Sequence, residues 1–277
     1  MIRLAVRCSP EDAERVLAEL VELVPGGVEE DRGETYVEFA VYGAPGELPS
    51  LPELEAAAGH GLVEVTSSEI PDDWVDRWRD FHRPLVIADR LRVRPSWLAA
   101  EENGGDAAIG VVIDPGRAFG TGAHATTRLC LELLLDVAGE GARGPLADWG
   151  TGSGVLAIAA AKLGFSPVAA CDHERAALDA AGQNAEANGV ELELSRVNLR
   201  EEAPPVSPTV TANLTAPVLG PIAERLAREG IEPPTTLICS GLLAPEADEI
   251  AAAFARAGLA ERERRAEGEW RALLLAR

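Results

Sequence analysis

The sequence has few cysteines for its length, and they are far apart. Its 277 residues include only Cys8, Cys130, Cys171 and Cys239, with no C-x-x-C pair among them. Zinc sites and disulfide frameworks need closely spaced or paired cysteines. We therefore interpret the four as buried, reduced thiols and expect no metal site.

Basic residues are also scarce. There are 25 Lys and Arg against 46 Asp and Glu, which gives a formal net charge of −21. Proteins that bind nucleic acid usually present a basic face, so we expect no direct recognition of nucleic acid. A basic protein partner suits this charge better. On charge alone, however, the favoured explanation is that the acidic residues merely keep the protein soluble.

The first residues lack a long hydrophobic run. Arginines interrupt the apolar stretch 1–7, so it is neither a secretory core segment nor a membrane span. We expect a cytoplasmic protein without membrane contact. A length of 277 residues and a hydrophobic content of 47% suit two globular domains with real cores.

Residues 1–67 predict a small ferredoxin-like α+β domain. Strand patterns cover 4–8, 35–42 and 62–65, and between them a capped helix begins at Ser9 and a weaker one spans 51–58. This order of strand, helix, strand, helix and strand is typical of the ferredoxin-like fold. Nothing in the segment indicates catalysis.

Residues 68–105 form a predicted connector with a tryptophan-rich helix. Trp74, Trp78 and Phe81 recur at helical spacing, which favours interdomain packing over a ligand site. From about Ile109 onward, within a predicted domain 106–277, apolar β-rich runs alternate with alanine-rich helical patterns. That alternation predicts a parallel sheet with helices on both faces.

A glycine-rich turn follows the predicted strand that ends at Trp149. Gly150, Gly152 and Gly154 are spaced G-x-G-x-G, and a helix pattern follows from 155 to 163. Glycine allows the backbone to turn sharply and approach a ligand closely. A dinucleotide site would need G-x-G-x-x-G, so a phosphate cradle is disfavoured, whereas a ligand carboxylate could bind at the helix N-terminus.

Two polar residues end the neighbouring predicted strands. Asp172 ends the strand 167–171, where a carboxylate can accept hydrogen bonds from both ribose hydroxyls of a nucleoside; the alternative is that it caps the helix 174–188. Asn213 ends the strand 208–212. Its amide can accept a hydrogen bond from an incoming amine and donate one as well.

Four ordered motifs resemble those of the PrmA family, the methyltransferases of ribosomal protein L11. They are D-P-G-R-A-F-G-T-G-A-H-A-T-T from Asp114, D-W-G-T-G-S-G from Asp148, A-C-D-H-E around Asp172 and A-N-L-T-A-P around Asn213. The similarity extends to I-A-D-R-L-R-V-R-P-S-W, to L-I-C-S-G-L-L and to the terminal E-G-E-W, and so covers most of 71–277.

The resemblance implies a Rossmann-like, seven-stranded class I methyltransferase domain preceded by a ferredoxin-like domain that recognises the substrate. It implies S-adenosylmethionine as the cofactor and a basic ribosomal protein as the partner, methylated on lysine or N-terminal amino groups. A monomer is expected. Carried over by motif, the cofactor-binding residues are Phe119, Thr127, Asp148, Gly150, Gly152, Gly154, Asp172 and Asn213, and the catalytic residues are Asn213, His124 and Thr126.

Three other functions compete with this one. A nucleic-acid amino-group methyltransferase usually has Pro-Pro and a stacking aromatic after the asparagine, where this chain has Leu214, Thr215 and Ala216. A related mitochondrial protein-lysine methyltransferase lacks the N-terminal domain and would carry a transit peptide. The third is a cofactor-binding protein without activity, which retention of the loop 124–127 beside a full cofactor site disfavours. For His124, proton acceptance and a loop-holding hydrogen bond are equally favoured.

Overall fold

The computed structural model describes residues 2–13, 16, 20, 29–33, 35–43, 62–69, 84–98, 109–114 and 124–277. The chain divides into two compact units, residues 1–81 and 82–277. The boundary lies inside the predicted connector 68–105, of which residues 70–83 and 99–105 are outside the described residues, as is the predicted helix 51–58. The exact domain bounds stay a prediction.

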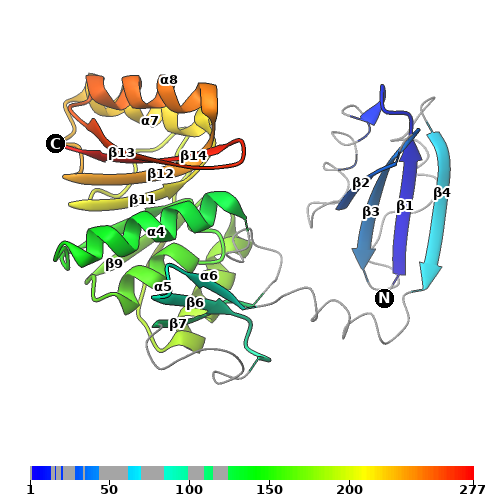
Figure 1. The fold of residues 1–277 in the computed structure, drawn as a ribbon, viewed down its shortest axis with the longest axis horizontal. Coiled ribbons are helices and arrows are strands. Elements are labelled where there is room, and N and C mark those ends of the chain that lie inside the picture. The colour runs from blue at the N-terminus through cyan, green and yellow to red at the C-terminus, as the bar shows by residue number, and fades with distance from the viewer. Residues whose placement is uncertain are drawn as a thin grey trace. The chain divides into compact units, whose positions relative to one another are not determined.

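The first unit contains one antiparallel sheet. Its strands are β1 (Ile2–Cys8), β2 (Glu29–Arg32), β3 (Val37–Gly43) and β4 (Leu62–Glu69), in the order β2-β3-β1-β4 (Figure 1). This order is that of the ferredoxin-like fold, as predicted. The sequence pattern missed β2, because its residues are all charged. Buried Ala13, Val16 and Leu20 recur at helical spacing after Ser9.

A small sheet begins the second unit. Strands β5 (Leu85–Ile87), β6 (Leu91–Arg94) and β7 (Ile109–Val112) form it, with β7 parallel to β6. The β-rich run at Ile109 therefore does not join the large parallel sheet. Instead, the side-chain amide of Asn188 accepts a hydrogen bond from Val112 N at 2.8 Å and donates one to Val112 O at 2.6 Å.

The large sheet has seven strands in the order β10-β9-β8-β11-β12-β14-β13. The first five are parallel to one another, whereas β14 is antiparallel to both β12 and β13. The elements are α4 (Ala125–Gly139), β8 (Leu146–Trp149), α5 (Val155–Lys162), β9 (Val168–Asp172), α6 (Arg175–Asn188), β10 (Glu193–Arg196), β11 (Thr209–Asn213), α7 (Ala216–Glu229), β12 (Thr236–Leu243), α8 (Ala244–Arg256), β13 (Ala260–Glu267) and β14 (Trp270–Ala276). The Rossmann-like α/β prediction is confirmed.

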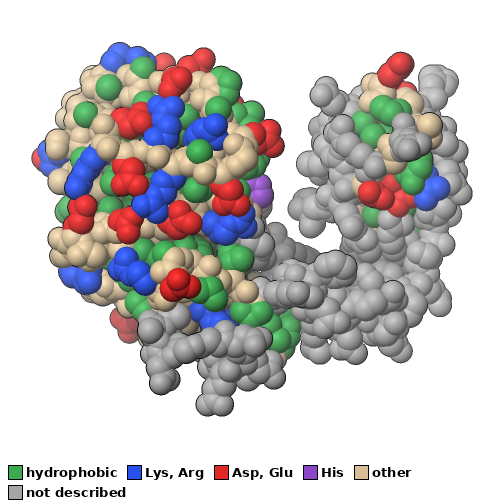
Figure 2. All heavy atoms as spheres, in the orientation of Figure 1, with side chains coloured by type: hydrophobic (Ala, Val, Ile, Leu, Met, Phe, Trp, Pro, Cys, Tyr) green, Lys and Arg blue, Asp and Glu red, His purple; other side chains and the backbone are tan. Residues whose placement is uncertain are grey.

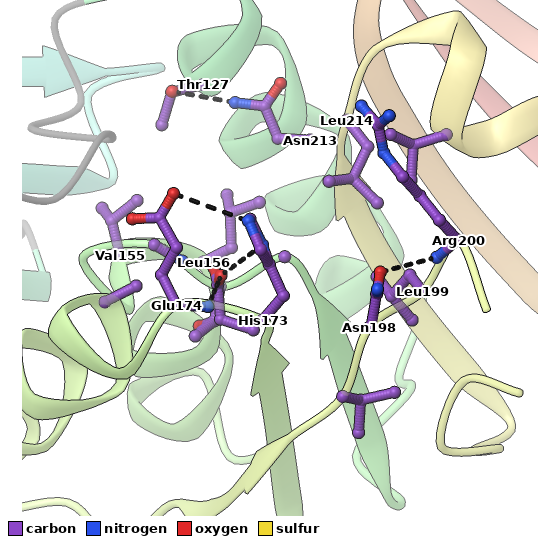
Figure 3. Close-up of a pocket in the computed structure, with 17 residues that line it drawn as sticks. Thr127, Val155, Leu156, His173, Glu174, Asn198, Leu199, Arg200, Asn213 and Leu214 are labelled. Carbon is purple, nitrogen blue, oxygen red and sulfur yellow. Dashed lines mark hydrogen bonds and ion pairs between the residues drawn. The ribbon is translucent and has the colours of Figure 1, made fainter. Parts of the chain in front are cut away.

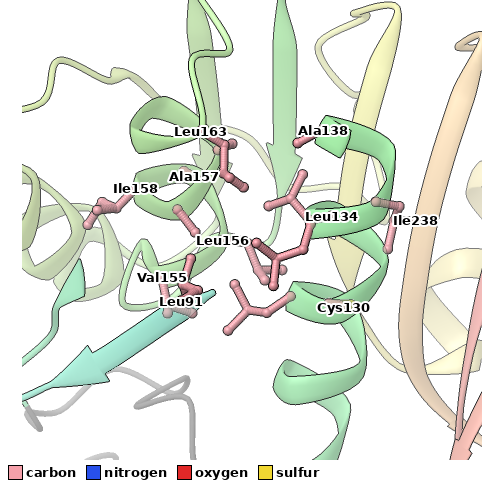
Figure 4. Close-up of a cluster of buried hydrophobic side chains, with 14 of the residues drawn as sticks. Leu91, Cys130, Leu134, Ala138, Val155, Leu156, Ala157, Ile158, Leu163 and Ile238 are labelled. Atoms are coloured by element: carbon pink, nitrogen blue, oxygen red, sulfur yellow. The ribbon is translucent and has the colours of Figure 1, made fainter. Parts of the chain in front are cut away.

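Two hydrophobic cores lie on opposite faces of this sheet. One joins the sheet to α4, α5 and α6, and Figure 4 shows part of it between α4 and α5. The other joins the sheet to α7 and α8. Successive strand residues alternate between them: Leu146 packs in the first core and Ala147 in the second, as the two-residue period of a strand requires. We call these the α4 face and the α7 face.

Charged side chains cover the edge strand β13. Arg265 pairs with Glu132 at 3.2 Å, and with Asp136 of α4 as well, and Arg264 pairs with Asp248 of α8 at 2.7 Å. Figure 2 shows the resulting mixture of acidic and basic side chains on this side of the second unit. Such charges discourage pairing of an exposed edge with another chain. No helix within the described residues is long and apolar enough to cross a membrane.

Candidate active site

A cavity of about 520 Å³ lies where the parallel strands β8, β9, β10 and β11 end. Open α/β sheets bind ligands at this edge, and the volume is typical of a small-molecule site. Figure 3 shows its walls, which come from the turns after all four strands and from the first turns of α4, α5, α6 and α7. The lining residues are Thr127, Gly150, Thr151, Gly152, Val155, Leu156, Asp172, His173, Glu174, Ala177, Val197, Asn198, Leu199, Arg200, Asn213, Leu214 and Val218.

The turn after β8 provides backbone to the cavity. Gly150 has φ +71° and Gly152 φ +53°, a region that side chains rarely adopt, and a Cβ on Gly150 would overlap Cδ2 of Leu214. Gly154, with φ +84°, precedes α5 and does not line the cavity; a Cβ there would lie 3.1 Å from that of Ala181. Its glycine is needed for the packing of α5 against α6.

Asp172 ends β9 at the cavity wall. Its Oδ2 accepts the Gly152 N–H and its Oδ1 the Glu174 N–H, both at 3.0 Å. The N-cap residue of α6 is Glu174, so Asp172 is not itself the cap. Because each carboxylate oxygen can accept more than one hydrogen bond, both keep capacity for a ligand. The carboxylate thus joins two turns and faces the cavity.

Asn213 and Thr127 meet on the opposite wall. Asn213 Nδ2 donates to Thr127 Oγ1 at 3.2 Å, as the dashed line in Figure 3 marks. No hydrogen bond among the described residues engages Asn213 Oδ1. The side-chain oxygen is therefore the atom that can accept from a ligand.

The backbone after Asn213 is fixed by the end of β12. Leu214 N donates to Ser240 O at 3.0 Å, and a Cβ on Gly241 would lie only 2.6 Å from the Leu214 carbonyl oxygen. Gly241 has φ +88°. The motif L-I-C-S-G-L-L therefore supplies the glycine that allows this close approach.

His124 and Thr126 stand at the start of α4 and do not line the cavity. His124 is the N-cap, and its Nδ1 lies 2.8 Å from Thr126 Oγ1. Its ring packs edge-on against Trp270, with 5.0 Å between the ring centroids. Arg128, one turn into α4, pairs with Glu267. The terminal E-G-E-W motif thus holds the start of α4, and the loop-holding interpretation of His124 gains a geometric basis.

Asp148 is a buried carboxylate behind the glycine turn. It is 1% exposed, does not line the cavity, and accepts hydrogen bonds from Thr151 and Thr211, both at 2.7 Å. Burial raises its pKa to about 6, although the two threonine hydrogen bonds lower it. Trp149 points to the α7 face, where its Nε1 donates to Pro205 O at 2.9 Å, so this bulky residue does not crowd the cavity.

Several cavity residues were not predicted from the sequence. Val197, Asn198 and Leu199 follow β10, which was missed because all four of its residues are exposed and they include no β-branched or aromatic residue. His173 and Glu174 follow Asp172 directly. Had β10 been recognised, its carboxyl end would have indicated the first three. The predicted Phe119 lies outside the described residues.

The four cysteines are buried, and none of them forms a disulfide. Burial raises the pKa of Cys171 and of Cys239 to about 12 and that of Cys130 well above its usual range, so these thiols stay protonated at neutral pH. No group of three or more His, Cys, Asp or Glu within the described part of the chain could hold a metal ion.

The chemistry of the cavity fits a nucleoside joined to an amino acid. The Asp172 carboxylate can accept from two hydroxyls, and apolar Val197, Leu199 and Ala177 can flank a flat ring. The glycine turn brings the backbone to the cavity at the N-terminus of α5, where a carboxylate is favoured. S-adenosylmethionine contains all three groups.

Comparisons with known proteins agree with this fit. The family described as ribosomal protein L11 methyltransferase (PrmA) matches residues 48–277. The protein named ribosomal protein L11 methyltransferase of Pelotomaculum thermopropionicum is 34% identical over 305 residues, covering 98% of this chain and 97% of that one. The protein of the same name from Pseudomonas fluorescens is 40% identical over 211 residues, covering 75% of this chain and 70% of that one.

A solved structure shares the fold. The ribosomal protein L11 methylase of Lactobacillus delbrueckii subsp. bulgaricus superposes with a TM-score of 0.63 at 29% identity, covering 71% of this chain and 99% of that one. The family match spans the whole second unit, and the full-length relative includes the first unit as well. The chain therefore belongs to the PrmA family and is a class I methyltransferase that uses S-adenosylmethionine.

Proposed function

We propose that this enzyme methylates amino groups, on lysine side chains or the N-terminus, of ribosomal protein L11. The observation that carries the proposal is the placement of Asn213 at the cavity wall, with its amide nitrogen held by Thr127 and its oxygen left to accept from an amine. The names of the relatives support the substrate. The net charge of −21 suits a basic ribosomal protein.

The residues of the cavity divide into those that would hold the cofactor and those that would hold the amine. Asp172, the glycine turn and the apolar wall after β10 belong to the first group, and Asn213 with Leu214 to the second. When bound, S-adenosylmethionine supplies a methyl group on a positively charged sulfur. Transfer of that group needs nitrogen, carbon and sulfur in line, so the main task of the protein is orientation.

Asn213 and the Leu214 carbonyl would orient the amine. A neutral amine has N–H donors for two acceptors while its lone pair points at the methyl carbon. Asn213 Oδ1 offers one acceptor. The Leu214 carbonyl, fixed by the close approach to Gly241, offers the second.

A lysine amine, with an ordinary pKa of about 10.4, must lose a proton before it can attack. The apolar side chains Leu156, Leu214 and Val218 line the cavity and disfavour the charged ammonium, which lowers the pKa of a lysine amine that enters. His124, the N-cap residue of α4, remains a second candidate for proton acceptance.

The remaining predictions about partners go with this proposal. We infer action in the cytoplasm, where ribosomal proteins are found, as a monomer and without direct nucleic-acid recognition. Leu214, which follows Asn213, is aliphatic and leans on the glycine turn, so the turn after β11 offers no aromatic face to a flipped base.

Mass spectrometry of ribosomal proteins from cells with and without the enzyme tests the substrate. Methyl groups on L11 amines should disappear when the gene is deleted. They should return when the deletion strain is complemented with the wild-type gene, but not when it is complemented with an Asn213→Ala variant. The proposal would be contradicted if L11 stayed methylated in the deletion strain, or if methyl groups were lost only from RNA.

Deleting residues 1–67 tests the recognition role of the first unit. Cofactor affinity of the truncated protein should stay within about twofold, since both cores of the second unit lie outside the deletion, whereas methylation of L11 should collapse. Calorimetry and a methylation assay with labelled cofactor measure the two effects. A folded truncation that still methylates L11 well would remove the recognition role.

A further inference from the structure

The buried carboxylate of Asp148 connects the two halves of the active site without touching the cavity. Strands β8 and β11 are neighbours, and their register places Asp148 directly beside Thr211. Thr211 Oγ1 donates to Asp148 Oδ1, and Thr151 Oγ1 donates to Asp148 Oδ2, both at 2.7 Å. Thr211 is fully buried and Thr151 is 5% exposed, so water does not compete for these bonds.

Each threonine is attached to a different part of the site. Thr151 lies between Gly150 and Gly152, in the turn that would hold the cofactor, and it lines the cavity. Thr211 is two residues before Asn213 on the same face of β11, because strand side chains alternate and the intervening Ala212 packs on the α7 face. A shift of Thr211 therefore moves Asn213 with it, because both belong to the same short strand.

The two threonine hydroxyls compensate most of the buried charge of Asp148. Within the described residues no Lys or Arg pairs with Asp148, although an unpaired carboxylate is costly to bury. The two hydroxyls are consequently the main donors that compensate its charge, together with the Ala157 backbone amide. Removing one hydroxyl leaves a carboxylate oxygen unsatisfied and frees the turn or the strand that carried it.

We propose that Asp148 is a positioning residue that sets the cofactor turn and the amine-orienting strand relative to each other through Thr151 and Thr211. The proposal rests on the proposed function for the part that concerns Asn213. Sulfur and nitrogen must lie in line across the transferred methyl, and these two atoms would be held by different turns. One carboxylate bonded to the turn after β8 and to the strand that carries Asn213 fixes that relation.

Substitutions of the two threonines by valine, which has the same shape without the hydroxyl, separate the two halves. At pH 8, both variants should lower the single-turnover rate at saturating cofactor about tenfold, because each breaks one of the two links that align sulfur and nitrogen. Thr151→Val should in addition raise the calorimetric Kd for S-adenosylhomocysteine about tenfold. Thr211→Val should leave that Kd nearly unchanged, because Thr211 lies on the strand that carries Asn213 and not in the turn that would hold the cofactor. Asp148→Asn should show both effects.

Thr209→Val is the matched control, because Thr209 is a buried threonine on the same strand and face, outside the pair of bonds to Asp148. Thr151→Ser and Thr211→Ser keep a hydroxyl and should restore wild-type values. The proposal is overturned if either valine variant keeps the turnover rate of the wild type, or if neither differs from Thr209→Val. Should Asp148→Asn fail to fold, the threonine pair still decides.

Failure of the proposed function would be recognised separately. An Asn213→Ala enzyme with wild-type turnover removes the amine role of Asn213. An unchanged Kd in Thr151→Val overturns the role of Asp148 whatever Asn213 does.

Discussion

The turn after β8 and the turn after β11 both carry a strand into a helix at the same edge of the sheet, but they present different groups. The first is built of glycines with positive φ and offers backbone to the cavity. The second offers the Asn213 amide and a carbonyl held by the neighbouring strand. A large cofactor needs close backbone approach, whereas a small amine needs one or two oriented acceptors.

The two turns also differ in what keeps them in place. Asp172 holds the glycine turn through the Gly152 N–H. The Asn213 turn depends on Ser240 and Gly241 of β12 and on Thr127 of α4. Damage to one turn should therefore alter cofactor binding and damage to the other should alter turnover. The following predictions test that separation.

Gly241→Ala should have the largest effect and should act on the second turn. Its positive φ and the 2.6 Å approach to the Leu214 carbonyl together predict a loss of about 4 kcal/mol of unfolding free energy or an equivalent displacement of that carbonyl. Gly230→Ala is the control, since it shares a positive φ of +62° but has open space around it. Denaturant unfolding and single-turnover methylation should show the control much less affected; equal losses would mean that φ alone matters.

The pH dependence of stability should report Asp148, which links the turn after β8 to strand β11. Burial raises its folded-state pKa to about 6 from an ordinary value of 3.8, so between these pH values the folded protein binds more protons than the unfolded chain. The unfolding free energy should then fall as pH rises from about 4 to 6, by ~3 kcal/mol, and level off above. Asp148→Asn should lack this component when urea unfolding curves of the two proteins are compared. If the unfolding free energies of the two proteins changed with pH in the same way, the raised pKa of Asp148 would be contradicted.

Asn213→Ala should act on turnover. A misplaced amine loses the benefit of orientation, so the single-turnover rate at saturating cofactor should fall about 100-fold, with some loss of cofactor affinity. If Asn213 only closes its turn, the variant should lose about 1 kcal/mol of stability and keep its turnover number. Thermal stability and single-turnover rate measured on one preparation distinguish the two outcomes.

Asp172→Ala should act on the first turn, through cofactor affinity. Hydrogen bonds to a carboxylate contribute roughly 1.5–3 kcal/mol, so the Kd for S-adenosylmethionine should rise about tenfold to a hundredfold. Part of the rise would come from the lost bond to Gly152 N–H. Calorimetry on the folded variant measures the change, and an unaltered Kd would remove Asp172 from the cofactor site.

The sequence predicted the residues that stand at strand ends with unusual chemistry. Gly150, Gly152, Asp172 and Asn213 all line the cavity, because the carboxyl ends of parallel strands meet at one edge. Their contacts with a cofactor stay predictions. The wall after β10 could not be predicted, since an exposed edge strand lacks the apolar alternation that marks a strand.

Strand neighbours were equally hidden in the sequence. The place of Asp148 in the glycine motif indicated a cofactor residue. Its bond to Thr211, 63 residues further along the chain, depends on β8 lying beside β11. The eight residues of the charged strand β13 lack the alternating apolar pattern of a strand. β13 lies at the edge of the sheet, where ion pairs to α4 and α8 cover it in place of apolar packing. Such information becomes available only with the topology.

The place of β14 in the sheet has a consequence for the biosynthesis of this protein. β14 is made after β13 yet lies between β12 and β13, and Trp270 at its start supports His124. While a growing chain has not yet passed residue 270, β13 has no strand to pair with, the apolar edge of β12 is open, and α4 lacks its aromatic support. The nascent enzyme should consequently depend on its last strand both for protection from aggregation and for a formed active site.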